Sequence, residues 1–219
     1  SKAGAADTLE ALGLDLDRAA ATAERSLSDL GIAFLFAQQH HPALKPLAAI
    51  RRAIGRRTVF NLVGPICNPA EVRRQLIGIA RPDFMPIYSE ALQLIGTDAA
   101  LLVAGDEPLD ELSIAGPSTI YAISAAGISS QRVTPADAGL PTHPLAALRG
   151  DDPAYNAAAL RRLLMGEASA YRDAVLLNAA AALLVADAAT SLADGAARAA
   201  AAIDDQTALH LLERWVAYR

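Results

Sequence analysis

Two adjacent carboxylates, Asp110 and Glu111, follow closely on the apolar run Ala99–Gly105. A short apolar run of this kind predicts a buried strand, and ligands of open α/β sheets bind beyond the carboxyl ends of the strands. Carboxylate oxygens at that edge suit Mg²⁺, which commonly joins protein carboxylates to a phosphorylated substrate. A metal site at Asp110 and Glu111 is therefore one interpretation of this stretch. The alternative is a solvated acidic turn that also includes Asp106 and Glu107.

The densest basic cluster of the chain is formed by Arg51, Arg52, Arg56 and Arg57. Neighbouring positions on a helix point about 100° apart, so Arg51 and Arg52 cannot serve the same ligand. An arginine of this cluster could bind a carboxylate or a phosphate through its forked guanidinium. Alternatively, the cluster complements the negative end of a helix dipole. The residue pattern leaves both interpretations open.

Histidine and cysteine give weaker signals. His40 and His41 are adjacent, so regular structure cannot turn both rings toward one site, and companion ligands for zinc are lacking. The single cysteine, Cys67, excludes an internal disulfide and a multi-cysteine metal site. No Ser-His-Asp arrangement has local support, and we assign no catalytic side chain.

The glycines of the chain are widely spaced. There are fourteen of them, and no two are closer than nine residues. A glycine-rich loop that cradles phosphate needs glycines close together, so no such loop is encoded in these 219 residues. If a phosphorylated substrate is bound, its main phosphate loop is missing from the chain or is made otherwise.

Three short apolar runs predict the strands that must position these residues: Gln75–Ala80, Ala99–Gly105 and Ser118–Ser124. A helix is predicted over Phe84–Gly96, between the first two runs. A strand, a helix and a strand within about thirty residues form a βαβ unit, whose strands are parallel. The predicted fold class is therefore α/β, with a mostly parallel sheet flanked by helices.

Both ends of the chain predict helices. Asp7 is the expected cap of a first helix that stops at Gly13. Ser26 is the expected cap of a short helix that ends near Gly31, and a third helix should end at Gly55. The last third of the chain carries helix-period apolar faces over three further stretches: Tyr155–Gly166, Tyr171–Asp187 and Gln206–Tyr218.

Composition bounds the class of protein. With 219 residues, 53% of them hydrophobic, the chain can bury a sizeable core in one domain or two small ones. A net charge of -5 and an aromatic content of 5% argue against a general attraction to nucleic acid or to anionic membranes. No apolar run reaches the roughly 18 residues of a spanning helix, and "SKAGAAD" lacks the apolar core of a signal peptide. We expect a cytoplasmic protein without a membrane partner.

Several stretches together resemble the anthranilate phosphoribosyltransferase family. They are, in order, "SKAGAADTLEALG", "FLFAQQHHPALKPLAAIRRAIGRRTVFNLVGPICNPA", "QLIGIA", "LDELS" and "RDAVLLNAAAAL". The most specific part is the Arg-Thr-Val-Phe-Asn…Gly-Pro…Asn-Pro stretch, followed in the right order by Leu-Asp-Glu-Leu-Ser. Within that specific part we expect Asn61 and Asn68 to bond backbone rather than substrate.

The resemblance implies a function. Members of this family transfer a phosphoribosyl group from phosphoribosyl pyrophosphate (PRPP) to the amine of anthranilate in tryptophan biosynthesis, and they use Mg²⁺. By resemblance, Asp110 and Glu111 bind the magnesium ions, and Arg51 rather than Arg52 holds the anthranilate carboxylate. Residues 1–55 would belong mainly to a small α-domain, and residues 56–219 to an incomplete α/β phosphoribosyltransferase domain. The family is usually a homodimer.

The chain also departs from the family pattern. The motifs Gly-Thr-Gly-Gly-Asp, Asn-Ile-Ser-Thr and Lys-His-Gly-Asn-Arg, which lie upstream in the family, are absent. We therefore expect a C-terminal portion that needs upstream sequence for activity and does not transfer phosphoribosyl groups alone. Smaller departures are Ala104 in place of a common histidine, Pro108 before Leu-Asp-Glu, and Leu44 where some members have an aromatic residue.

Two other interpretations compete with this one. A non-catalytic relative of the same fold could bind nucleic acid, but a basic patch is not evident against the net charge of -5. A pyrimidine nucleoside phosphorylase has a related fold and a similar Leu-Glu-Ala helix. That class explains neither the Phe-Asn…Asn-Pro stretch nor the acidic pair.

Overall fold

The structure is a computed structural model of the chain, and it describes residues 4–35, 50, 53, 55, 64–107 and 109–219. The chain divides into two compact units. The first unit comprises residues 1–71, 150–161 and 208–219, and the second comprises residues 72–149 and 162–207. The second unit contains the sheet and the acidic pair.

Four strands of the second unit form one sheet in the order β1-β2-β3-β4, with the bounds β1 Arg74–Gly78, β2 Ala99–Gly105, β3 Ser118–Ser124 and β4 Gly127–Val133. Strands β1 and β2 are parallel. The connection between them runs through the 3₁₀ turn η4 (Pro82–Phe84) and helix α6 (Met85–Leu94). The α/β class and the predicted βαβ unit are thus confirmed.

The directions of the other strands correct the expectation of a mostly parallel sheet. Strand β3 is antiparallel to β2, and β4 is antiparallel to β3. A parallel return needs a crossover, usually a helix, whereas the described residues between β2 and β3 contain no helix. Strand β4 was not predicted, because most of its side chains are exposed and polar. It follows β3 through a tight turn in which Gly127 adopts φ 126°.

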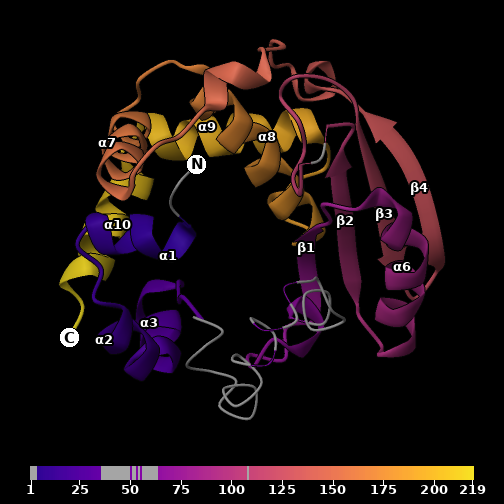
Figure 1. Ribbon diagram of the computed structural model, residues 1–219, viewed down its shortest axis with the longest axis horizontal. Helices are drawn as coiled ribbons and strands as arrows, with labels where there is room; N and C mark the ends of the chain where they lie inside the picture. Colours follow the sequence, from indigo (N-terminus) through magenta and orange to yellow (C-terminus); the bar gives the residue numbers. More distant parts are fainter. Residues whose placement is uncertain (1–3, 36–49, 51–52, 54, 56–63, 108) are drawn as a thin grey trace. The chain divides into compact units, whose positions relative to one another are not determined.

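Helices cover both faces of this sheet. Leu101 and Val103 of β2 pack into a buried cluster with residues of α8 (Ala170–Val185) and α9 (Leu192–Asp204). Side chains alternate along a strand, so the fully buried Leu102 points to the opposite face, where α6 lies (Figure 1). The alanine-rich helix α9 was not predicted. It lies so close to α8 that a Cβ on Gly195 would come within 2.7 Å of the Cα of Ala180.

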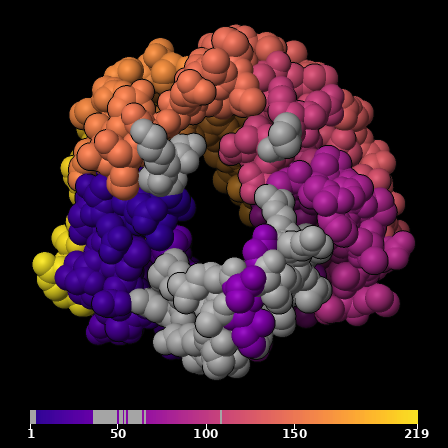
Figure 2. Space-filling view, in the orientation of Figure 1, coloured from indigo at the N-terminus to yellow at the C-terminus, as the bar shows by residue number. Residues whose placement is uncertain are grey.

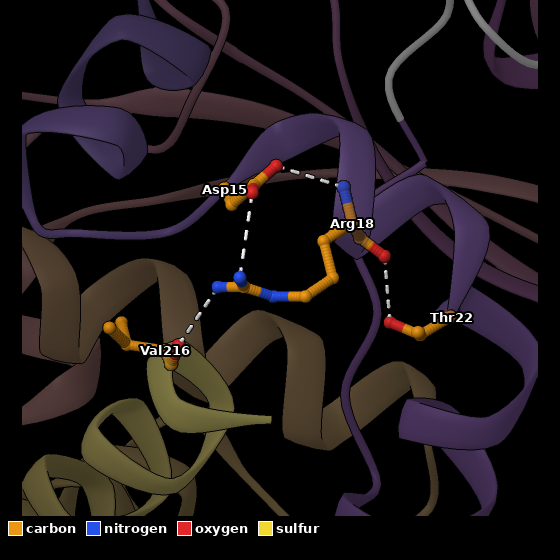
Figure 3. Close-up of polar contacts among 4 residues, drawn as sticks. All are labelled: Asp15, Arg18, Thr22 and Val216. Atoms are coloured by element: carbon orange, nitrogen blue, oxygen red, sulfur yellow. Dashed lines mark hydrogen bonds and ion pairs between the residues drawn. The ribbon is translucent and has the colours of Figure 1, made fainter. Parts of the chain in front are cut away.

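The first unit is helical. It contains α1 (Ala5–Ala11), α2 (Leu16–Ala21), α3 (Ala23–Leu30), most of α7 (Pro153–Leu164) and nearly all of α10 (Thr207–Ala217). Arg18 ties α2 to the C-terminal helix, because its Nη2 donates to the carbonyl of Val216 at 3.3 Å, while Asp15 and Thr22 bond its backbone (Figure 3). Figure 2 shows the N-terminal helices against the yellow C-terminal segment. The predicted boundary between residues 55 and 56 stays a prediction.

Local details correct two of the predicted helix caps. Asp7 lies inside the first turn of α1, where its Oδ2 accepts a hydrogen bond of 2.8 Å from the N–H of the N-cap residue Gly4. Ser26 lies inside α3, and its hydroxyl donates to the carbonyl of Ala23. The stop at Gly31 is confirmed by its left-handed φ of 78°. The predicted helix that ends at Gly55 falls almost wholly outside the described residues.

Candidate functional site

The acidic pair lies in a loop that begins where β2 ends. We call residues 106–117 the acidic loop. The N–H of Gly105 donates to the carbonyl of Leu109 at 3.1 Å, and the N–H of Asp106 donates to the carbonyl of Pro117 at 3.2 Å. These bonds close the loop at its base, beyond the carboxyl end of β2, as the sequence predicted.

The backbone of Asp110 also reaches the end of the neighbouring strand β1. A Cβ built on Gly78, the last residue of β1, would stand 1.6 Å from the carbonyl oxygen of Asp110. No side chain fits in that space, so the position requires glycine. The pair is therefore placed against the ends of two parallel strands, which is where open α/β sheets bind ligands.

Helix α8 holds the next residue of the loop. The side chain of Asn178 accepts a 2.8 Å hydrogen bond from the N–H of Leu112 and donates to the carbonyl of Leu112 at 3.0 Å. The same amide donates to the carbonyl of Ala174 at 3.0 Å. Sequence reasoning missed Asn178, although a lone amide among the alanines and leucines of "AVLLNAAAALL" was a usable signal.

Strand β3 holds the loop from another side. The hydroxyl oxygen of Ser118 accepts a hydrogen bond of 2.8 Å from the N–H of Ser113, and both serines are buried. The hydroxyl of Ser113 accepts in turn from the N–H of Ala115. Buried backbone groups need such partners, so these serines serve the loop and are not free nucleophiles.

The acidic pair has no counter-charge in contact with it among the residues that the structure describes. Within the part of the chain that the structure describes, neither Asp110 nor Glu111 forms an ion pair. Loss of solvent around the carboxyl raises the pKa of Glu111, and the negative charge of Asp110 raises it further. A cation bound between the two would relieve this repulsion.

Tyr171, in the first turn of α8, lies near enough to the pair for the charge of Glu111 to act on its phenol. Burial raises the pKa of its phenol, and the charge of Glu111 adds to the effect. Nothing in the sequence connects these two residues, which are 60 positions apart. Tyr171 is thus a neighbour of the site that only the fold reveals.

The other acids of the loop behave differently. Arg132 of β4 forms a forked ion pair with Asp106, with Nη1 2.6 Å from Oδ1, and also donates to Thr119 at 2.9 Å. Hydrogen bonding and the charge of Arg132 lower the pKa of Asp106. Glu107 has one carboxylate oxygen that is buried without a hydrogen-bond partner among the described residues. Among the described residues of the loop, Asp110 and Glu111 are therefore neighbouring acids that both lack an ion-pair partner.

The donor set fits Mg²⁺ bound in part by other ligands. Among the described residues no group of three or more His, Cys, Asp or Glu side chains is arranged to hold a metal ion. Mg²⁺ commonly takes only one or two protein carboxylates and completes its octahedron with water and substrate phosphate. The pair can supply those two hard oxygen ligands.

Residues 1–209 match the sequence model of a protein family that is described as the glycosyl transferase family, α/β domain. The chain belongs to this family. Two curated relatives, the anthranilate phosphoribosyltransferases of Sphingopyxis alaskensis and Novosphingobium aromaticivorans, are each 58% identical to it. The matches cover 100% and 99% of this chain and 66% of each relative. The chain thus spans just under two thirds of the length of these relatives, and the predicted resemblance is confirmed.

Solved structures of the same glycosyl transferase family agree. The anthranilate phosphoribosyltransferase of Thermus thermophilus superposes with a TM-score of 0.91 at 40% identity, over 98% of this chain and 64% of that one. The Saccharomyces cerevisiae enzyme in complex with PRPP and Mg superposes with a TM-score of 0.88 at 27% identity, over 97% and 62%. The fold of this member is therefore that of its enzymatic relatives.

The remaining predicted site residues of this family member have mixed outcomes. Arg51, Arg52, His40, His41 and Asn61 lie outside the described residues, as do Arg56, Arg57, Leu44 and Pro108. The Oδ1 of Asn68 accepts a 2.9 Å hydrogen bond from the N–H of Ala70, which confirms the expected bond to backbone. Cys67 is an exposed free thiol.

Proposed function

We propose that the chain is part of an anthranilate phosphoribosyltransferase, which transfers the phosphoribosyl group of PRPP to the amine of anthranilate in tryptophan biosynthesis. The observation that carries the proposal is the pair Asp110–Glu111 at the ends of β1 and β2, which has no ion-pair partner among the described residues, in a chain 58% identical to enzymes of that name. The Saccharomyces cerevisiae relative was solved in complex with PRPP and Mg, and in complex with 4-fluoroanthranilate. Of these ligands, the magnesium that accompanies PRPP matches the chemistry of the acidic pair.

Asp110 and Glu111 are proposed to bind Mg²⁺ together with the pyrophosphate of PRPP. When bound, the metal neutralises the negative charge that develops on the departing pyrophosphate. The pair is suited to this role because its carboxylates are adjacent and carry no protein counter-charge among the described residues. Occupation by a cation would also favour the ionised form of Glu111, against its raised pKa.

Arg51 is proposed to bind the carboxylate of anthranilate. A guanidinium can hold a carboxylate through two parallel hydrogen bonds, and that contact would aim the weakly nucleophilic amine at the sugar carbon. Positioning of this kind supplies much of the rate acceleration when two substrates must meet. Transfer then needs no covalent intermediate on the protein.

The nucleic-acid alternative gains no support from the described arginines. Eight of them form ion pairs with carboxylates: Arg18, Arg73, Arg74, Arg81, Arg132, Arg162, Arg172 and Arg198. Paired cations release fewer counterions on a phosphate backbone than free ones would. No helix of the described residues is long and apolar enough to cross a membrane. We infer a cytoplasmic enzyme, and the homodimer implied by the family stays a prediction.

The metal role is tested by joining the chain to the segment of the Sphingopyxis alaskensis relative that lies outside the match. The loss of anthranilate fluorescence is then followed with PRPP and varied Mg²⁺. Glu111→Gln should lower kcat and raise the Mg²⁺ concentration needed for half-maximal rate. Glu90→Gln, which changes an exposed glutamate of α6, is the matched control and should leave both unchanged. Equal behaviour of the two variants would contradict the metal role.

The acceptor role is tested in the same assay with two adjacent arginines. Removal of a hydrogen bond to a charged group costs about 1.5–3 kcal/mol, so Arg51→Gln should raise the KM for anthranilate roughly 10- to 100-fold. The matched control Arg52→Gln should change that KM little. The reverse order would assign the carboxylate to Arg52. The unmodified 219-residue chain is expected to show no turnover by itself, and robust turnover would refute that expectation.

A further inference from the structure

The acidic loop is fixed on both sides of Glu111. On one side the carbonyl of Asp110 occupies the space that a side chain on Gly78 would need. On the other side Leu112 gives both its N–H and its C=O to the amide of Asn178. Glu111 therefore stands between a close backbone approach to β1 and a hydrogen-bonded anchor on α8.

The amide of Asn178 is committed to this task. Its nitrogen donates to Leu112 and to Ala174, and its oxygen accepts from Leu112. Both donors are therefore used within the protein. The amide lies on an otherwise apolar helix that packs into the core, where a polar group must find partners. Its contact with Leu112 joins residues 66 positions apart, so it is not a local helix feature.

Electrostatic repulsion gives this anchoring a purpose. Asp110 and Glu111 are neighbouring acidic residues, so their carboxylates repel each other when both are ionised. A free loop could separate the two carboxylates by rotating its backbone. The close packing at Asp110 and the hydrogen bonds at Leu112 restrict that rotation, so the backbone of the pair is held in place before any metal arrives.

We propose that Asn178 and Gly78 are positioning residues for the acidic pair, which act through the backbone of Leu112 and of Asp110 and touch neither metal nor substrate. The proposal rests on the metal role of the pair proposed above. Groups that orient metal ligands from behind affect metal affinity strongly, and their loss commonly weakens binding about 10- to 100-fold. The same loss is expected here.

The test uses the ¹⁵N-labelled chain and Mn²⁺, whose paramagnetism broadens amide resonances near a bound ion even when binding is weak. Mn²⁺ should broaden the resonances of Asp110 and Glu111 in the unmodified chain. Asn178→Ala should weaken the apparent Mn²⁺ affinity at these resonances about 10- to 100-fold, and Gly78→Ala should weaken it as well. Unchanged affinity in both variants would overturn the proposal.

Two matched controls separate positioning from general stability. Asn156 binds both backbone groups of Asp151 in the way that Asn178 binds Leu112, so Asn156→Ala should leave Mn²⁺ affinity unchanged. Gly116 belongs to the acidic loop, but a Cβ there meets only ordinary contact at 3.9 Å, so Gly116→Ala should also leave it unchanged. If the controls lose as much affinity as the test variants at matched unfolding midpoints, a positioning role is refuted.

Two further measurements keep this inference distinct from the proposed function. In a Glu111→Gln background, Asn178→Ala should cause no additional loss of Mn²⁺ affinity, which a merely structural role would not predict. Hydrogen exchange of the Leu112 amide should be faster in Asn178→Ala than in the unmodified chain, and an unchanged rate would refute the anchor. If Mn²⁺ broadens neither Asp110 nor Glu111 in the unmodified chain, the proposed metal site fails, whereas the exchange rate still decides the anchor.

Discussion

Asp106 and the pair Asp110–Glu111 share one loop, yet their electrostatic surroundings are opposite. Asp106 is matched by the guanidinium of Arg132, and its pKa is lowered. The pair faces no cation among the described residues, and the pKa of Glu111 is raised. The difference arises from β4, which brings Arg132 next to Asp106 at the base of the loop. A carboxylate of this loop that is paired with an arginine has a structural role, whereas one without a cationic partner is available to a ligand.

The largest expected effect separates the two positions by activity. In the joined enzyme described above, Asp110→Asn removes one proposed metal ligand, and metal stabilisation of a leaving group is worth several kcal/mol. The rate of phosphoribosyl transfer should therefore fall about 100-fold or more. Asp106→Asn should leave that rate within a few-fold, because its partner is a protein cation. Similar losses in the two variants would remove the functional distinction between the positions.

The second expected effect is stabilisation by Mg²⁺. A ligand that binds only the folded chain raises its free energy of unfolding, by about 2.7 kcal/mol when present at 100 times its Kd. Mg²⁺ should raise the urea midpoint of the unmodified chain and of Asp106→Asn, followed by circular dichroism. It should not raise the midpoint of the double variant Asp110→Asn/Glu111→Gln. A rise of equal size in the double variant would place the Mg²⁺ site elsewhere.

The third expected effect is smaller and has opposite signs at the two positions. The folded chain holds the proton of Glu111 more tightly than the unfolded chain does, so the stabilisation is present at low pH and is lost as the pH rises through the raised pKa. Asp106 has a lowered pKa, so its stabilisation is present above the ordinary carboxyl range and is lost as the pH falls through that lowered pKa. Near neutral pH, Glu111→Gln should therefore raise the urea midpoint in metal-free buffer, and Asp106→Asn should lower it. A shift of the same sign in both would contradict these directions.

The same contrast shows what sequence reasoning could reach. Strands β1, β2 and β3 and helix α6 were predicted, because short apolar runs and helical periods are local signals. The position of Asp110–Glu111 at the strand ends followed from those signals and is confirmed by the contact with Gly78. An isolated glycine inside "QLIGIA" already indicates a close approach of another backbone.

What the sequence could not supply depends on contacts between distant residues. The direction of β3 depends on how the acidic loop returns, which residue types alone do not determine. Arg132 stands on β4, whose polar, exposed pattern resembles a loop, so its pairing with Asp106 was not foreseen. Asn178 and Tyr171 reach the loop only because α8 packs across the sheet. The role of Arg51 stays a prediction, since that residue lies outside the described part of the chain.

The smallest expected effect is a change in the pKa of Tyr171 that depends on the charge of Glu111. Burial is the larger cause of the raised phenol pKa, and Glu111 is the second. In an alkaline titration followed by tyrosine absorbance, Glu111→Gln should lower the pKa of Tyr171 while leaving it above its usual range. Mg²⁺ should lower it in the unmodified chain for the same reason, because a bound cation offsets the charge of Glu111.

Tyr171→Phe identifies the responding component among the five tyrosines. Tyr218, whose pKa is raised by its hydrogen bond to Asp29, is the internal control and should not respond. If Glu111→Gln leaves the Tyr171 pKa unchanged, the phenol does not sense the pair. If only Mg²⁺ fails to change it, the cation does not bind at Glu111, and the contrast with Asp106 loses its functional meaning.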